Sequence, residues 1–69
     1  MHLGGHMPFV QVTMIEGRSD EQKHALMAKI TSAVEEAVGA KRESIRVAIY
    51  EVSPDDWSIG GEPISKLRP

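Results

Sequence analysis

The chain has 69 residues, with eight basic and ten acidic side chains, a net charge of -2 and no cysteine. A chain of this length forms a single domain that buries only about 60% of the surface its unfolded form exposes, so its own core is marginal. Without cysteines or a cluster of metal ligands, we expect self-association to complete the fold. The near balance of charge, without a long charged run, excludes the footprint of a nucleic-acid-binding protein.

The sequence also argues against a membrane partner. No stretch reaches the ~20 apolar residues that a membrane span requires, and the first residues lack the basic and apolar regions of a signal peptide. We therefore expect a cytoplasmic protein, and the absence of cysteine is compatible with that location.

Residues 1–7 are rich in glycine and differ in composition from the rest of the chain. We interpret them as a leader, either a cloning remnant or an unprocessed extension, in front of a domain that covers residues 8–69. His2 and His6 have the four-residue spacing of a helical metal pair, but the two glycines between them oppose a helix. We therefore expect no metal site in the leader.

Residues 9–15 alternate in the way typical of a strand. Pro8 is tolerated just before it, because a missing N–H does little harm at a strand start. Val10, Val12 and Met14 lie on one face, and Phe9, Gln11, Thr13 and Ile15 lie on the other. The strand thus has one strongly apolar face. Gly17 then allows the chain to turn.

The next segment carries the signals of a helix. Ser19 and Gln22 have the spacing of a capping box, and Gly39 marks the C-terminal end. His24 falls outside the apolar stripe, so we interpret it as a solvent-facing residue rather than a catalytic one. The stripe recurs at intervals of three and four residues and comprises Leu26, Met27, Ile30, Ala33, Val34, Ala37 and Val38.

Residues 44–52 follow a linker over residues 40–43 and are rich in β-branched side chains, which predicts a second strand. Ile45, Val47 and Ile49 lie on one of its faces, and Arg46, Ala48 and Tyr50 lie on the other. Strand, helix and strand in this order predict a β-α-β unit whose two strands are parallel.

The remaining residues predict a small hairpin. A turn cluster over residues 53–56 and the short apolar run Trp57-Ser58-Ile59 precede Gly60-Gly61, a hairpin-type dipeptide. Two strands and one helix cannot cover both faces and both edges of a sheet, so we expect the hairpin to reach onto another copy of the chain. The predicted class is α+β, a single β-α-β unit with parallel strands and a C-terminal hairpin.

Four motifs then carry a resemblance to a known family. They are Pro8-Phe9-Val10-Gln11, the run from Glu16 to Lys23, Ser44-Ile45-Arg46-Val47, and Trp57-Ser58-Ile59-Gly60-Gly61-Glu62 with Ser65-Lys66 beyond it. In this order and spacing the chain resembles the 4-oxalocrotonate tautomerase family from Pro8 to Pro69, without a gap. The resemblance implies a homo-hexamer, a trimer of dimers, that catalyses proton shifts in enol or dienol acids such as those from aromatic degradation, without a metal or other cofactor.

The same resemblance implies roles for individual residues. Pro8 matches the amino-terminal proline that serves as general base, if the mature chain begins there. Arg18 and Arg46 match the two arginines that orient the substrate. Trp57 matches an aromatic residue supplied by another subunit, where the best-known members carry phenylalanine. We expect Ile15 and Ile59 to add apolar lining to the substrate site.

The chemistry of these residue types agrees with such a reaction. A proton shift next to a carbonyl requires a base that titrates near neutral pH and a positive group where enolate charge develops. A proline with a free amino terminus is a secondary amine, whereas a proline inside the chain is an amide without a basic nitrogen. An arginine grips a carboxylate in two hydrogen bonds and stays charged.

Each residue also has a structural interpretation that the sequence leaves open. Pro8 can be a strand opener only. Arg18 can pair with a neighbouring acid, and Arg46 can form a salt bridge across a subunit interface. Trp57 can be an interface anchor, and the two isoleucines can belong to the core.

Two other functions also remain open. With the leader attached, the chain can be a catalytically silent oligomer or binding module, because Pro8 would then carry an amide. Alternatively, it can be a haloacrylate dehalogenase or hydratase, in which Glu16, Asp55 or Asp56 activates water.

Overall fold

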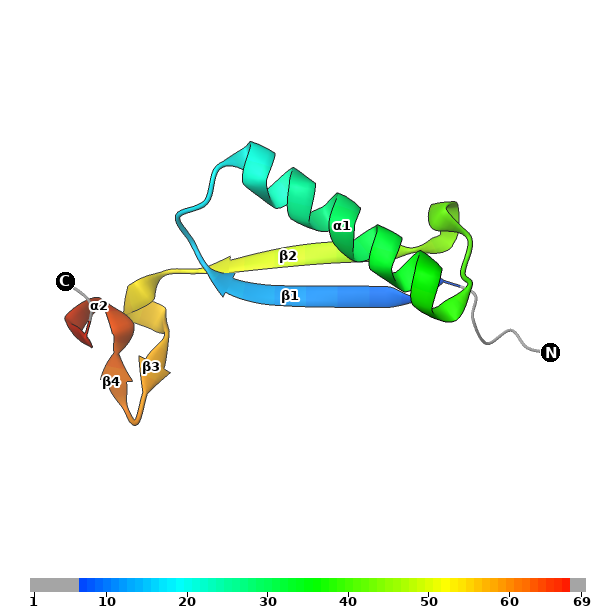
Figure 1. Cartoon of the computed structure of the whole chain (residues 1–69). Helices are drawn as coiled ribbons and strands as arrows, with labels where there is room; N and C mark the ends of the chain where they lie inside the picture. Colours follow the sequence, from blue (N-terminus) through cyan, green and yellow to red (C-terminus); the bar gives the residue numbers. More distant parts are fainter. Residues whose placement is uncertain (1–6, 68–69) are drawn as a thin grey trace.

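The computed structural model describes residues 7–67, so the predicted leader lies outside the described residues except for Met7. Figure 1 shows a long helix above a pair of strands, with a small hairpin beyond one end of that pair. The elements in chain order are β1 (Phe9–Ile15), α1 (Asp20–Val38), the 3-10 turn η1 (Arg42–Ser44), β2 (Arg46–Val52), the 3-10 turn η2 (Pro54–Asp56), β3 (Ser58–Ile59), β4 (Glu62–Pro63) and α2 (Ile64–Leu67).

Strands β1 and β2 are parallel, as the β-α-β pattern predicts. Their register runs from Phe9 opposite Arg46 to Ile15 opposite Val52. The sheet has a helix-covered face and an outer face. On β1 the half-buried residues Val10, Val12 and Met14 alternate with exposed ones, and Ile15 at the end of the strand is half-buried as well. The predicted apolar face of β1 is therefore the helix-covered one.

Helix α1 begins and ends where the sequence indicates. The Gln22 N–H donates to Ser19 Oγ over 3.1 Å, and the Ser19 N–H donates to Gln22 Oε1 over 3.0 Å, which completes the capping box. Gly39 adopts a left-handed conformation with φ of 74° and donates its N–H to the Glu35 carbonyl. Glycine suits this end because a side chain opposes that conformation.

The second strand is shorter than expected and begins at Arg46 instead of residue 44. Ser44 belongs to η1, where both its N–H and its hydroxyl donate to the Lys41 carbonyl. The Ile45 N–H donates to the Arg42 carbonyl. These donors are used in the turn, so they do not join the sheet.

The predicted helix stripe is only partly covered. Its half-buried members are Leu26, Met27, Ile30 and Val34, whereas Ala33, Ala37 and Val38 are exposed in the single chain. Neighbouring strands lie about 4.8 Å apart, so a two-stranded sheet is narrower than the full apolar stripe. The exposed part of the stripe remains available to another chain.

The hairpin forms as predicted, with β3 and β4 antiparallel around Gly60 and Gly61. The short helix α2 was not expected, because four residues carry no helical periodicity. It begins at Ile64, which is 6% exposed. The tail therefore folds back far enough to bury Ile64.

The single chain has almost no core. Within residues 7–67 only Ala40 and Ile64 are buried, and Phe9 and Tyr50 are exposed on the outer face of the sheet. Large apolar side chains on an unpartnered sheet face are typical of a protein interaction surface. No helix in this part of the chain combines the length and apolar character needed to cross a membrane.

The capping box provides a test of how α1 is held. We expect Ser19→Ala to lower the free energy of unfolding by about 1 kcal/mol, because the Gln22 N–H loses its partner. Ser19→Asn keeps a capping oxygen and should stay near the wild type. Urea denaturation at one fixed protein concentration measures both, and equal stability of the two variants would contradict the role of the cap.

Candidate active site

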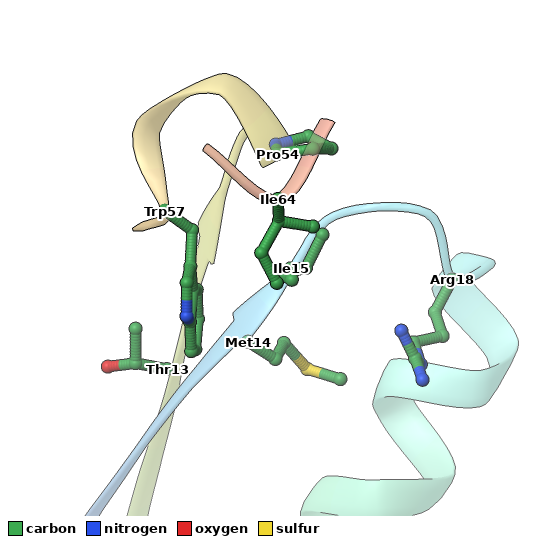
Figure 2. Close-up of a pocket in the computed structure, with 7 residues that line it drawn as sticks. All are labelled: Thr13, Met14, Ile15, Arg18, Pro54, Trp57 and Ile64. Carbon is green, nitrogen blue, oxygen red and sulfur yellow. The ribbon is translucent and has the colours of Figure 1, made fainter. Parts of the chain in front are cut away.

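A cavity of about 470 Å³ lies where the end of β1 meets the folded tail (Figure 2). It is lined by Thr13, Met14, Ile15, Arg18, Pro54, Trp57 and Ile64. Most of these side chains are apolar, and Arg18 contributes the positive charge. Such a cavity suits a small molecule with an apolar body and an anionic group.

Arg18 is placed by the turn between β1 and α1. The Glu16 N–H donates to the Val52 carbonyl over 3.0 Å and so extends the ladder one residue past β1. Gly17 then turns the chain with φ of 132°, a conformation that glycine readily adopts. Arg18 precedes the cap residue Ser19, so the turn and the helix start hold it from both sides.

Arg18 has no ion-pair partner among the described residues. Asp20, one of its possible neutralising partners, lies 3.5 Å from the Lys23 ammonium instead. A guanidinium beside apolar walls, without a carboxylate of its own chain, can receive an anionic ligand.

Trp57 forms the opposite wall of the cavity, and backbone hydrogen bonds fix its position. The Ile64 N–H donates to the Trp57 carbonyl over 2.7 Å, which ties the start of α2 to the residue after η2. The Ser65 hydroxyl donates to Asp55 and clamps the same two segments. Figure 2 shows the Trp57 ring on the Thr13 side and Arg18 on the other side of Met14 in this view.

A second cavity, of about 290 Å³, adjoins the first because the two share Met14 and Arg18. Its other lining residues are Gln22, Lys23 and Leu26. The Lys23 ammonium donates to Glu51 over 2.8 Å. Its charge is therefore already matched by a carboxylate, unlike that of Arg18.

The hydrogen bond to Glu51 raises the pKa of Lys23 above its ordinary value of 10.5, and attraction to Glu51 and Asp20 adds to this effect while desolvation opposes it. A raised pKa means that the pair stabilises the fold fully below pH 10.5 and loses this effect as the pH rises through the folded-state pKa. Lys23 therefore stays charged at neutral pH.

Pro8 and Arg46 lie together at the other end of the sheet. The Arg46 N–H donates to the Pro8 carbonyl over 2.9 Å. The exposed Arg46 side chain donates to the Ser44 carbonyl over 2.9 Å, and it has no ion pair with Glu51 or Glu62 in the described chain. At about 3.3 Å per residue, β1 separates this end from the cavity by roughly 20 Å.

The predicted site residues thus fall into two groups. We call Pro8 and Arg46 the proline end, and Ile15, Arg18 and Trp57 the tryptophan end. The structure brings the members of each end together and separates the two ends within one chain. Ile59 is 57% exposed on β3 and does not line the cavity, so its role stays a prediction.

Four lining residues were not identified from the sequence: Thr13, Met14, Pro54 and Ile64. Thr13 and Met14 precede Ile15 on the strand, so the role of Ile15 could have indicated them. Pro54 and Ile64 reach the cavity only because the tail folds back. In the part of the chain that the structure describes, no group of three or more histidine or acidic side chains is arranged to hold a metal ion.

Comparisons with known proteins identify the family of the chain. The sequence model of the family described as tautomerase enzyme matches residues 8–67. A 2-hydroxymuconate tautomerase of Comamonas testosteroni is 48% identical over 61 residues, which are 88% of this chain and 97% of the relative. The chain therefore belongs to the tautomerase enzyme family.

Solved structures share the fold as well as the sequence. A 4-oxalocrotonate tautomerase isozyme of Methylibium petroleiphilum is 47% identical with a TM-score of 0.85, over 90% of this chain and all of that one. A heterohexamer 4-oxalocrotonate tautomerase of Chloroflexus aurantiacus is 37% identical with a TM-score of 0.84, over 90% of this chain and 100% of that one. The β-α-β unit with its C-terminal hairpin is thus the fold of this family.

The contact between Ser65 and Asp55 provides a test of how Trp57 is held. We expect Ser65→Ala to lower stability by about 1 kcal/mol, since a hydroxyl that binds a carboxylate is lost. It should also increase acrylamide quenching of Trp57, the single tryptophan of the chain. Ser58→Ala, at an exposed residue of β3, is the matched control. Equal quenching in the two variants would show that other contacts hold Trp57.

Proposed function

We propose that this protein is a tautomerase that moves a proton within enol or dienol carboxylic acids of the 2-hydroxymuconate type. The observation that carries the proposal is Arg18, a cation without an ion-pair partner in the described chain, beside Trp57 in a largely apolar cavity. The relative from Comamonas testosteroni, which is named for this substrate, supports the substrate class.

The proposed site forms between copies of the chain. Two sheets placed antiparallel bring the proline end of one beside the tryptophan end of the other, which removes the separation of roughly 20 Å within one chain. The exposed Phe9 and Tyr50 on the outer face provide apolar surface for this contact. A homo-hexamer built as a trimer of dimers is the proposed assembly, and the heterohexamer of Chloroflexus aurantiacus supports it.

In the proposed mechanism a free amino-terminal Pro8 is the base. Its secondary amine takes the proton from the enol hydroxyl while the oxygen forms a carbonyl and the double-bond electrons move toward carbon. The protonated amine then returns that proton to a carbon of the substrate, so no net charge or proton is lost. Arg46 from the proline end stabilises the negative oxygen, and Arg18 binds a carboxylate.

The cavity walls contribute by excluding water. Trp57 and Ile64 form an apolar surface next to Arg18, and charge interactions are stronger where water is excluded. An aminium formed there is disfavoured, so the amine remains available as a base near neutral pH.

The carboxylates of this end support a tautomerase rather than a haloacrylate dehalogenase. Asp55 accepts a hydrogen bond from Ser65, and neither Asp56 nor Glu16 lines the cavity. A dehalogenase of this type requires a carboxylate that faces the substrate and activates water. We therefore expect no halide release from 3-haloacrylates, which a halide assay measures directly.

The role of Pro8 predicts a difference between two forms of the protein. A chain that begins at Pro8 should convert 2-hydroxymuconate to its keto form about 10²- to 10⁴-fold faster than the 69-residue chain, because general-base catalysis contributes that much. Stopped-flow absorbance follows the reaction. The oligomeric state of both forms, from light scattering, is the control.

Equal rates in two equally assembled forms would show that a free Pro8 amine is not the base. The 69-residue chain would then carry another catalytic group. If both forms are inactive toward 2-hydroxymuconate, the proposed substrate class is wrong.

The proposed roles of the two arginines can be tested by substitutions in the chain that begins at Pro8. We expect Arg46→Gln to lower kcat/KM by about 10²- to 10³-fold, the loss typical of removing one group that stabilises a developing anion. Arg18→Gln should lower kcat/KM by about 10- to 10²-fold, the loss of one charge-assisted contact to a substrate carboxylate. Arg42→Gln is the control, because Arg42 forms a surface ion pair with Glu35 over 3.1 Å. Normal activity of the Arg18 variant would contradict its place in the site.

A further inference from the structure

The ion pair of Lys23 and Glu51 has a distinctive position in the fold. It connects α1 to β2, and within residues 7–67 it is the one side-chain hydrogen bond that joins this helix to the β1–β2 sheet. The two side chains are 20% and 29% exposed, whereas those of the Arg42–Glu35 pair are 49% and 42% exposed. The pair is therefore better shielded from water than an ordinary surface pair.

The same ion pair spans the turn that carries Arg18. On the sheet side, Glu51 precedes Val52, whose carbonyl accepts the Glu16 N–H. On the helix side, Lys23 follows Gln22, which closes the capping box with Ser19. The 2.8 Å contact between the two charged groups therefore holds together the two anchors between which Arg18 lies.

Lys23 also affects the charge around Arg18. Both line the second cavity, together with Met14 and Leu26. Glu51 and Asp20 neutralise the Lys23 ammonium, so it does not compete with Arg18 for an anion or repel its guanidinium. The pair thus fixes the turn and leaves the charge of Arg18 available.

From this arrangement we propose that Lys23 and Glu51 are positioning residues that set the place and the charge environment of Arg18. The inference rests on the proposed function, in which Arg18 binds a substrate carboxylate. It adds to that function that a pair of residues outside the main cavity sets how strongly the site prefers a dicarboxylate over a monocarboxylate. Neither residue touches the substrate.

Ligand binding tests the inference without any need for catalysis. We choose adipate and hexanoate, which have six carbons each but two and one carboxylates. The protein is the chain that begins at Pro8, because the described hydrogen bonds and elements all lie from that residue onward. Isothermal titration calorimetry gives the ratio of the two affinities.

The variants are Lys23→Met, which keeps an unbranched side chain without the charge, and Glu51→Gln. Each should reduce the preference for adipate by about tenfold, the size of one charge-assisted hydrogen bond to the second carboxylate, and leave hexanoate binding within about twofold. Lys29→Met, an exposed substitution on the same helix, is the matched control. Lys23→Arg keeps the cation and should restore most of the preference.

The outcomes separate the inference from the proposed function. If the wild type prefers adipate and both variants retain that preference, the positioning role is wrong. If both ligands weaken equally in the variants, the pair supports the fold in general and the inference is also overturned. If the wild type itself binds adipate no more tightly than hexanoate, the second carboxylate of a diacid finds no partner in the site and the proposed function fails. In the active enzyme, the variants should raise KM for a dicarboxylate more than they lower kcat.

Discussion

The structure depends on one constraint: in the described chain, the two strands β1 and β2 have a helix over one face and no covering element over the other (Figure 1). Burial of apolar surface is the main favourable term in folding, and within residues 7–67 only Ala40 and Ile64 are buried. Phe9 and Tyr50 remain on the open face. In the proposed assembly another chain covers that face, so folding and association would be coupled.

The same two strands set the geometry of the candidate site. Because β1 and β2 are parallel and in register, Pro8 lies just before β1 and beside Arg46 at the start of β2, and the strands end together at Ile15 and Val52. The turn and the folded tail then add the cation and the aromatic wall at that second end. A site with a base at one end and an anion-binding group at the other suits antiparallel contact between copies, which the open sheet face permits.

Much of this arrangement could be predicted because it depends on local patterns. The alternation from Phe9 to Ile15, the capping box of Ser19 and the glycine pair of the hairpin each specify one element through neighbours in the chain. The remainder depends on contacts between distant residues. Ile64 is buried because the tail folds back, and the Lys23–Glu51 pair requires the helix to lie over β2, so neither has a local signal. β2 begins at Arg46 instead of Ser44 because Ser44 donates a hydrogen bond to the carbonyl of Lys41, a close neighbour in the chain.

The separation of the proline end from the tryptophan end determines how mutations in different copies of the chain combine. In the proposed assembly, each chain contributes its two ends to two different sites. A copy that lacks Pro8 and a copy that lacks Arg18 would therefore complement each other, because a mixed assembly contains some sites with both lesions and some with neither. After a gene duplication, the two ends could likewise diverge in separate copies, each of which retains only the half that its partner requires.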